Sequence, residues 1–244
     1  MKTLFTLAMT TTMTAAAAAA NFQTDSFTTN EGKAITITAI KHSSLRIQYD
    51  GLEIQVDPVG KGVAPETDYS LFPKADIILV THEHFDHFDR DAIAALTKDG
   101  TQVIANPAVR GMLASGIAMT NGESRAVANG VSIAAVPAYN TTPGREKFHP
   151  KGRDNGYVLT LGGFSIYIAG DTEDIPEMSL LRDIDVAFLP CNQPYTMTPG
   201  QASKAALAIR PKVLFPYHCS ETPVARVAEL LAGEEIDVRI RDYR

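Results

Sequence analysis

The first part of the chain alternates apolar and polar residues in short stretches. Three of these stretches have β-branched residues and a period of two, and they predict strands at residues 34–40, 44–50 and 52–58. Between the last two, Asp50-Gly51 indicates a tight hairpin turn. Residues 75–80 (ADIILV) then form an almost wholly apolar run. Such a run is typical of a strand that is buried on both faces.

Later stretches show helical and strand periodicity in turn. Residues 89–100 start with aspartate, carry a helical apolar pattern and stop at glycine, which predicts a helix. The same patterns predict further helices at 108–116, 175–183, 198–211 and 222–233, and strands at 101–107, 130–140, 157–163, 164–171, 184–190, 212–218 and 237–242. No linker rich in Pro, Gly or Ser divides the pattern, and two similar mixed halves are discernible. We therefore predict one α/β domain over residues 21–244, with two sheets inside and helices outside.

Residues 1–20 differ from the rest of the chain. They combine Lys2, a modestly apolar middle and six alanines directly before Asn21. These are the parts of a secretory signal with cleavage after Ala20, so we expect an exported protein, periplasmic if the source is Gram-negative. A frayed Ala-rich helix is the alternative interpretation. The segment is too short and too polar for a stable membrane span.

Composition limits the possible partners. Of the 244 residues, 45% are hydrophobic and 20% are charged, which is a globular composition. The formal net charge of −6 provides no basic field for nucleic acid or anionic lipid. No other stretch approaches membrane length. We therefore expect a small-molecule partner, with no nucleic acid and no membrane span.

A histidine cluster follows the apolar run at once. Residues 80–89 (VTHEHFDHFD) contain three of the six histidines of the chain. In an extended segment the side chains of His82 and His84 emerge on the same side. Asp86 and His87 come next, where the chain turns. Neutral imidazole and carboxylate groups are ligands for zinc, iron or manganese. The cluster therefore predicts a metal site.

The motif HEHFDH at residues 82–87 resembles the His-x-His-x-Asp-His motif of the metallo-β-lactamase superfamily. AGD at 169–171 resembles the later Gly-Asp of that family, and PYH at 216–218 resembles its last metal histidine. The resemblance covers essentially the whole chain after the leader. It points to the branch of small, stand-alone metal-dependent hydrolases that includes ascorbate-6-phosphate lactonase and the N-acyl-phosphatidylethanolamine phospholipase. The fold it implies is a four-layer αββα sandwich.

The resemblance also implies a set of ligands. His82 and His84 would hold a first metal ion, while Asp86, His87 and His218 would hold a second. Asp171 would lie between the two ions. Asp86 and Asp171 are the catalytic residues of this hypothesis, because their carboxylates offset part of the charge of the cations.

One position departs from the family pattern. The family supplies a third histidine to the first ion, after a strand and before Gly-Asp, but here Tyr139 and Asn140 stand at that place. His149 is the only histidine between the cluster and Asp171. We favour His149 as the missing ligand. The alternatives are that Asn140 offers its amide oxygen, that the first site is weak or empty, and that His149 is a surface residue.

Other residues are expected near this site. His42 lies where relatives carry a histidine near the mouth of the site, and an ordinary strand-end histidine is the alternative. Asp57 resembles a buried aspartate that orients a metal ligand or braces the first loop; a turn aspartate before proline is the competing interpretation. Residues 192–197 are expected to line the pocket, with Tyr195 touching the substrate.

Two cysteines, Cys191 and Cys219, are expected beside the site. Thiolate ligation, a disulfide and two plain buried thiols are all open, and plain thiols are commonest for isolated cysteines.

The predicted function is hydrolysis assisted by metal ions. Two divalent ions, Zn²⁺ before Mn²⁺ or Fe²⁺, would share a hydroxide that attacks an ester, lactone or phosphodiester, and their pocket would suit an anionic or carbonyl substrate. A family member that binds metal without catalysis and a di-iron redox protein are the alternatives. Redox relatives carry a flavin domain, for which this chain has no room.

Overall fold

The computed structural model describes residues 22–128 and 130–243, and the predicted signal segment 1–20 lies outside them. The described chain forms two sheets of seven strands each. The first sheet contains β1 Thr24–Thr28, β2 Ala34–Lys41, β3 Ser44–Tyr49, β4 Leu52–Val56, β5 Ile77–Val80, β6 Gln102–Ala105 and β7 Ile117–Ala118. The second contains β8 Ser124–Ala128, β9 Val131–Ala138, β10 Asp154–Leu161, β11 Phe164–Ile168, β12 Val186–Pro190, β13 Val213–Tyr217 and β14 Asp237–Val238.

The two sheets repeat one topology. In each sheet the strands lie side by side in the order of the sequence. The first three pairings of each sheet are antiparallel and the last three are parallel. The two mixed halves discerned in the sequence therefore correspond to the two sheets.

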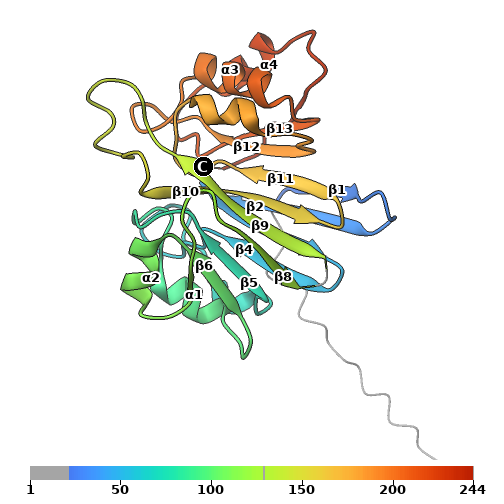
Figure 1. Ribbon diagram of the computed structural model, residues 1–244, viewed down its shortest axis with the longest axis vertical. Coiled ribbons are helices and arrows are strands. Elements are labelled where there is room, and N and C mark those ends of the chain that lie inside the picture. The colour runs from blue at the N-terminus through green and yellow to red at the C-terminus, as the bar shows by residue number, and fades with distance from the viewer. Residues whose placement is uncertain (1–21, 129, 244) are drawn as a thin grey trace, which may run out of the picture.

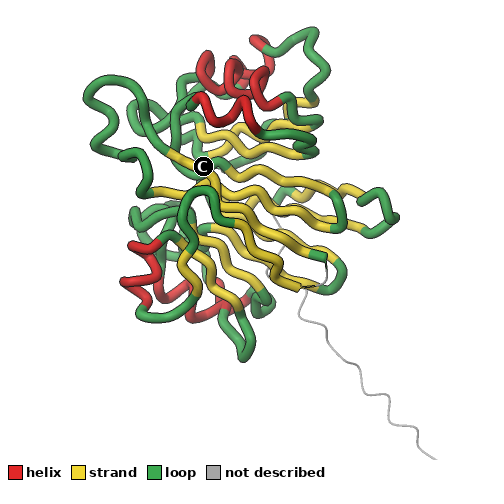
Figure 2. Tube along the Cα trace, in the orientation of Figure 1, coloured by secondary structure: helices red, strands yellow, loops and turns green. Residues whose placement is uncertain are grey.

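Helices cover only the outer faces of the sheets (Figure 2). α1 (Arg90–Leu96), α2 (Pro107–Leu113) and the 3₁₀ helix η1 (Tyr69–Leu71) pack on the first sheet. α3 (Pro199–Ile209), α4 (Ala225–Leu230) and the 3₁₀ helix η2 (Pro176–Leu180) pack on the second. Figure 1 shows these two helical layers at opposite sides of the sheets. The predicted αββα sandwich is therefore confirmed.

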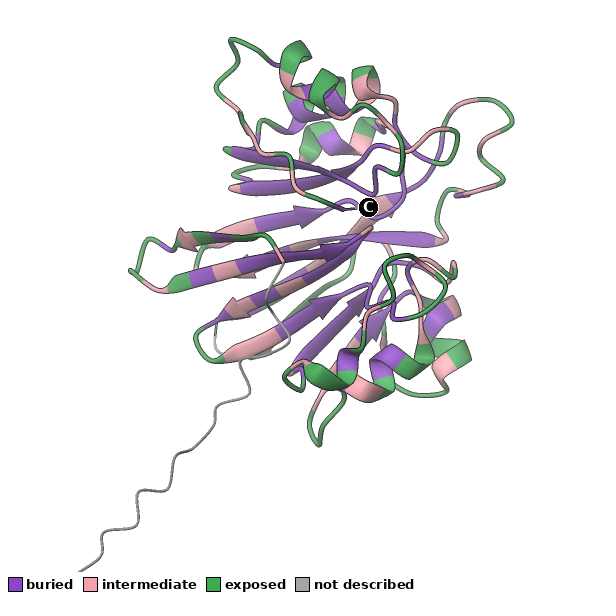
Figure 3. Ribbon diagram, turned by 180° about the vertical axis from the view of Figure 1, so that it is seen from behind, coloured by how far each residue is buried: buried purple, intermediate pink, exposed green. Residues whose placement is uncertain are grey.

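The apolar run at residues 75–80 lies in two different cores. Ile77 and Leu79 face the second sheet, whereas Ile78 and Val80 face the helices of the outer layer. Both faces of β5 are thus buried, as its pattern predicts. Figure 3 shows that the strands between the helical layers are largely buried, while the helices and loops are exposed on their outer sides. The central core fixes how the sheets align, and so where their strand ends meet.

Helix starts agree with the capping signals in the sequence. The Asp89 carboxylate accepts hydrogen bonds from the first backbone N–H groups of α1, at 2.9 and 3.2 Å. α3 starts with Pro199 and is preceded by a capping box between Thr198 and Gln201. Within the described residues, no helix is long and apolar enough to cross a bilayer.

Some predicted elements are shorter than expected, and others were missed. The helix predicted at 175–183 is only the 3₁₀ helix η2, because the backbone becomes extended at Leu181. The strand predicted at 237–242 is only β14, since Arg239 and Arg241 turn toward Asp25 on β1. The strands β1, β7 and β8 were not predicted; β7 has only two residues, and β1 (TDSFT) has Phe27 as its only apolar residue, so neither shows an alternating pattern.

Candidate metal centre

The predicted ligands stand at the ends of strands from both sheets. His82, His84, Asp86 and His87 lie in the loop after β5, Asp171 follows β11, and His218 follows β13. His149 lies in the long loop between β9 and β10. Carboxyl ends of neighbouring parallel strands meet at one edge of a sheet, which is where α/β folds commonly bind ligands. The sandwich brings the edges of its two sheets together at this place.

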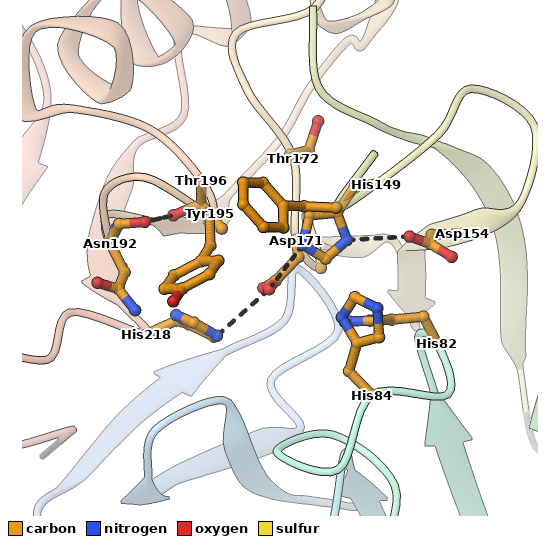
Figure 4. A network of polar contacts seen from close by, with 12 residues as sticks. His82, His84, His149, Asp154, Asp171, Thr172, Asn192, Tyr195, Thr196 and His218 are labelled. Carbon is orange, nitrogen blue, oxygen red and sulfur yellow. Dashed lines mark hydrogen bonds and ion pairs between the residues drawn. The ribbon is translucent and has the colours of Figure 1, made fainter. Parts of the chain in front are cut away.

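A first group of donors consists of His82, His84 and His149. One nitrogen from each imidazole lies within 4.8 Å of the other two. His82 Nε2 and His84 Nδ1 are 3.1 Å apart. His149 is buried, not a surface residue, and the loop carries it back to the histidine cluster as predicted. Figure 4 shows the three imidazoles turned toward one another.

The side-chain NH₂ group of Asn140 holds that loop, whereas its Oδ1 is buried without a hydrogen-bond partner. Its side-chain amide donates to the carbonyl oxygens of Tyr195 at 2.7 Å and Arg145 at 3.3 Å. Its backbone N–H donates to the carbonyl of His149 at 2.8 Å. Asn140 thus positions the segment from which the His149 imidazole projects.

A second group contains Asp86, His87 and His218, together with His42. Their donor atoms also lie within 4.8 Å of one another. His42 Nε2 is 3.1 Å from Asp86 Oδ2, and the rings of His42 and His218 have centroids 3.7 Å apart. His42 was expected only near the mouth of the site. The structure places its imidazole among the donors themselves.

Asp171 lies between the two groups. One carboxylate oxygen is 3.2 Å from His87 Nε2. The other is 3.3 Å from both His149 Nε2 and His218 Nε2 (Figure 4). Among the described residues, Asp171 is therefore the one carboxylate that contacts both the first group and the second.

Several buried nitrogen and oxygen atoms of this cluster, all of them possible metal ligands, have no hydrogen-bond partner. They are His87 Nε2, both ring nitrogens of His218 and Asp171 Oδ1. A buried polar atom without a partner costs about 1–3 kcal/mol. Imidazole nitrogens and carboxylate oxygens that face one another at this spacing suit divalent cations. The residues present therefore fit the metal that the family resemblance implies.

Hydrogen bonds behind the cluster fix which imidazole nitrogen faces it. Asp57 Oδ2 lies 2.8 Å from His87 Nδ1, and Asp57 also accepts hydrogen bonds from the backbone and hydroxyl of Thr81, both at 2.7 Å. Asp57 thus both orients His87 and braces the loop, as predicted. Because the Thr81 hydroxyl donates to Asp57, it accepts from His82 Nδ1 at 3.0 Å. The Nε2 lone pairs of both histidines are then directed into the site.

Two positioning residues were not foreseen. Asp154 Oδ2 is 3.0 Å from His149 Nδ1 and leaves Nε2 of that ring toward Asp171. Buried Glu173 accepts from the backbone N–H groups of Thr141 and Thr142 at 2.8 and 2.6 Å, which anchors the loop that carries His149. Glu173 lies two residues after the predicted ligand Asp171, and this proximity in the sequence could have indicated that Glu173 has a role at the site. Asp154 carries no such signal, since it starts a strand after a turn.

Burial and neighbouring charges shift the pKa values of the clustered histidines and of Asp171. Burial lowers the pKa of His82 well below its usual value, with neighbouring His87 as a further cause. Burial also lowers the pKa of His84, aided by His149 and Arg153. Burial alone would raise the pKa of Asp171, but His218 and His87 more than offset it and hold that pKa well below its usual range. Burial alone would lower the pKa of His87, but Asp171 and Asp57 more than offset it and hold that pKa well above its usual value. The neutral imidazoles of His82 and His84 beside ionised Asp171 are in the protonation states that bind metal, whereas His87 must release a proton to do so.

The backbone is held in a rare conformation at three of these residues. His42, Asp57 and His218 have φ angles of 47°, 42° and 50°. The left-handed region is unfavourable for residues with a Cβ, and it persists where the surrounding structure enforces it. Here a backbone hydrogen bond of 3.0 Å from His218 N–H to the His42 carbonyl joins the two sheets. These strained backbone conformations therefore lie at or next to the proposed metal ligands.

A cavity of about 750 Å³ opens over the cluster. Its lining includes Tyr195, as expected, and Asn192 from the same loop. Cys191 and Cys219 are buried free thiols, so the expectation of plain thiols is met and no disulfide joins them. Figure 4 shows Tyr195 and Asn192 on the side of the cluster where His218 lies.

A sandwich of two mixed sheets with an imidazole and carboxylate cluster at its edge defines the metallo-β-lactamase fold. A model of the β-lactamase superfamily domain matches residues 36–218. A UPF0173 metal-dependent hydrolase of Thermococcus kodakarensis is 31% identical over 220 residues, which cover 84% of this chain and 96% of the relative. The chain therefore belongs to the β-lactamase superfamily, in its UPF0173 branch of metal-dependent hydrolases, which confirms the resemblance to small stand-alone hydrolases.

Solved structures agree with this assignment. A candidate metal-dependent hydrolase from Parabacteroides distasonis is 54% identical, with a TM-score of 0.89 over 92% of this chain and 100% of that one. A metallo hydrolase from Ignicoccus hospitalis is 26% identical, with a TM-score of 0.69 over 85% of this chain and 95% of that one. Both similarities extend over nearly the whole described chain.

Proposed function

We propose that this protein uses two divalent ions, Zn²⁺ before Mn²⁺ or Fe²⁺, to hydrolyse an ester, lactone or phosphodiester. The observation that carries the proposal is the position of Asp171, whose carboxylate contacts imidazoles of both groups: Oδ1 lies near His87, and Oδ2 lies near both His149 and His218. When bound, such ions supply a hydroxide nucleophile near neutral pH and polarise the attacked oxygen. A serine or cysteine nucleophile is not required.

In this proposal the ligands divide into two sets. His82, His84 and His149 hold the first ion, and Asp86, His87 and His218 hold the second. Asp171 contacts both. The distances within each group support this division, because every donor atom lies within 4.8 Å of its partners. Asp86 and Asp171 serve catalysis by holding the ions and by offsetting part of their charge.

The surrounding residues keep these ligands in place. Asp57 holds the proton on His87 Nδ1, and Asp154 does the same for His149. Such partners keep the other ring nitrogen unprotonated and aimed at the cation. Asn192 and Tyr195 line the cavity beside His218, where a bound substrate would contact them.

Metal analysis together with activity assays tests the proposal. Protein purified without added chelator is expected to contain two equivalents of zinc and to hydrolyse 4-nitrophenyl esters or diesters. His84→Ala should abolish the activity and leave the fold intact by circular dichroism. His149→Ala should lower the metal content by about one equivalent. An unchanged metal content in His149→Ala would instead favour Asn140 as the third ligand of the first ion.

The alternatives give different results in the same experiment. Two irons and a visible absorption band would favour redox chemistry, and one metal or none without turnover would favour binding alone. Full activity in His84→Ala would refute the first site.

We also propose that residues 1–20 are a secretory signal and that the protein is exported, to the periplasm in a Gram-negative cell. The support is the composition of that segment, with Lys2 before an apolar middle and six alanines. Mass spectrometry of protein recovered from its native cells should show Asn21 as the first residue. An intact Met1 would contradict export by this route.

A further inference from the structure

The cavity over the metal centre has aromatic walls. Phe85, Phe148, Tyr195 and Tyr243 all line it. Phe85 stands directly between the proposed ligands His84 and Asp86, yet 72% of its surface is exposed. Tyr195 is 45% exposed, and its ring packs edge-on against Phe148 with centroids 5.0 Å apart. Large aromatic side chains left exposed beside a reactive centre are surfaces that a ligand can cover.

The same walls lack cationic side chains. Among the described residues, no lysine or arginine lines the cavity, and Glu221 is its only charged residue outside the donor cluster. Anionic phosphate groups are generally recognised by arginine or lysine through charge-assisted hydrogen bonds. Away from the proposed metal ligands, an anion in this cavity would therefore meet the like-charged carboxylate of Glu221.

The two arginines closest to the cluster are already paired. Arg153 Nη2 lies 3.3 Å from His84 Nε2, but its guanidinium donates to both Asp154 oxygens, at 2.6 and 2.9 Å. Arg145 donates to Gln193 and lies 3.6 Å from Glu173. Their charges are therefore engaged by carboxylates of the protein and not directed into the cavity.

We propose, building on the hydrolytic function above, that the substrate is an uncharged ester or lactone that carries an aromatic or branched apolar group. Its carbonyl reacts at the metal centre while the apolar group lies against Phe85, Phe148 and Tyr195. The cavity of about 750 Å³ is large enough for such a molecule, since small-molecule sites commonly measure about 300–1,000 Å³.

The reaction is a simple hydrolysis. The oxygen of water forms a bond to the carbonyl carbon, and the bond from that carbon to the ester oxygen breaks with its electron pair. One proton of water goes to the leaving alcohol, and the other is released by the carboxylic acid product. A lactone gives a single hydroxy acid. No oxidant or reductant is needed.

Three chromogenic substrates test the substrate class on the metal-loaded protein. All three carry the aromatic 4-nitrophenyl group; 4-nitrophenyl phenylacetate has a further phenyl ring on its acyl side, 4-nitrophenyl acetate has no ring on that side, and bis(4-nitrophenyl) phosphate is an anion. The phenylacetate is expected to have about a tenfold lower KM than the acetate, because its phenyl ring is partly buried against the aromatic walls; tenfold corresponds to about 1.4 kcal/mol. Phe85→Ala and Tyr195→Ala should each raise the KM of the phenylacetate about fivefold, and should raise the KM of the acetate by a smaller factor, because the acetate has no acyl ring to lose contact.

Matched variants separate contact from general damage. Leu180→Ala removes an equally exposed apolar side chain that does not line the cavity, so its kinetics should match the parent protein. Glu221→Lys should raise kcat/KM for the anionic diester about fivefold at low ionic strength, and added salt should reduce that gain.

Binding of N-benzylacetamide, followed by calorimetry, gives a measurement that does not depend on turnover. Phe85→Ala should weaken it about fivefold. A parent protein that prefers the diester, or variants with unchanged KM and unchanged binding, would overturn the substrate class and leave the hydrolase standing. Absence of any turnover with intact, Phe85-dependent binding would overturn the hydrolytic function while the apolar recognition stands.

Discussion

Asp154 orients the proposed metal ligand His149 without binding the metal itself. It is buried, and its Oδ2 lies 3.0 Å from His149 Nδ1. Asp154→Asn keeps the shape but removes the charge, so we expect metal affinity to fall about 10–100-fold. Competition with a chromophoric chelator measures the affinity. Asp50→Asn, at an exposed turn, is the control, and equal affinity in both variants would exclude a positioning role for Asp154.

At the same scale, Cys191 gives a dependence of stability on pH. Burial raises the pKa of its thiol from 9.0 to about 12. The unfolded chain therefore loses this proton at a lower pH than the folded chain. The protonated thiol therefore contributes its full share to the free energy of unfolding below about pH 8.5. That share falls as the pH rises toward 12, by up to about 1.4 kcal/mol per pH unit. Urea unfolding of the parent and of Cys191→Ala between pH 7.5 and 10 should give a steeper decline for the parent; parallel declines would contradict it.

At the scale of elements, the end of β2 holds the loop that forms one wall of the cavity. The buried ammonium of Lys41 donates to the carbonyl oxygens of Gly60, Val63 and Pro65, at 2.9, 2.7 and 2.8 Å. Asp89, the cap of α1, accepts from the N–H of Gly60 at 2.9 Å. A single strand end and a single helix start thus fix a segment without regular structure over the metal centre.

Lys41→Met tests this anchor. It leaves three carbonyl oxygens without their donor, so we expect a loss of about 3 kcal/mol in the free energy of unfolding. Faster hydrogen exchange in residues 60–67 should accompany that loss. Lys33→Met, which removes an exposed pair with Asp50, should leave the free energy of unfolding nearly unchanged. Equal losses in the two variants would show that Lys41 contributes no more than a surface lysine.

At the scale of the whole molecule, the two ends of the described chain meet beside the metal centre. Asp25 on β1 accepts hydrogen bonds from Arg239 at 3.0 Å and from Arg241 at 2.9 Å. The Tyr243 carbonyl accepts from the N–H of His42 at 2.9 Å, and the His42 carbonyl accepts from His218. Contacts between the chain ends therefore continue by backbone hydrogen bonds into the second group of donors.

Asp25→Asn should loosen that connection. We expect faster hydrogen exchange at the amides of His42 and His218 and a loss of about 2 kcal/mol in stability, because two arginines lose their shared carboxylate. Exchange at β5 should stay unchanged. Glu229→Gln, which removes an exposed pair with Arg226, is the control. Unchanged exchange at both histidines would mean that the tail does not support the site.

Much of the architecture follows from the sequence alone. The period-two stretches, the apolar run at 75–80 and the caps at Asp89 and Thr198 predict most elements, because these signals act between residues close in the chain. The metal-binding character of residues 82–87 follows from the same local density of imidazole and carboxylate groups. Alternation fails where a strand is very short or has few apolar residues, as at β7 and β1, and where a strand ends early, as at β14.

Only the tertiary structure decided which distant side chains share one site. The sequence left His149 and Asn140 as alternatives; the folded loop brings the His149 imidazole to the cluster, while the Asn140 NH₂ group holds the backbone and its Oδ1 has no hydrogen-bond partner. His42 was expected at the mouth, and it lies among the donors because the ends of β2 and β13 meet. Local periodicity fixes strands and helices, but the distance between two strand ends depends on how the sheets pack, and no short stretch of residues encodes it.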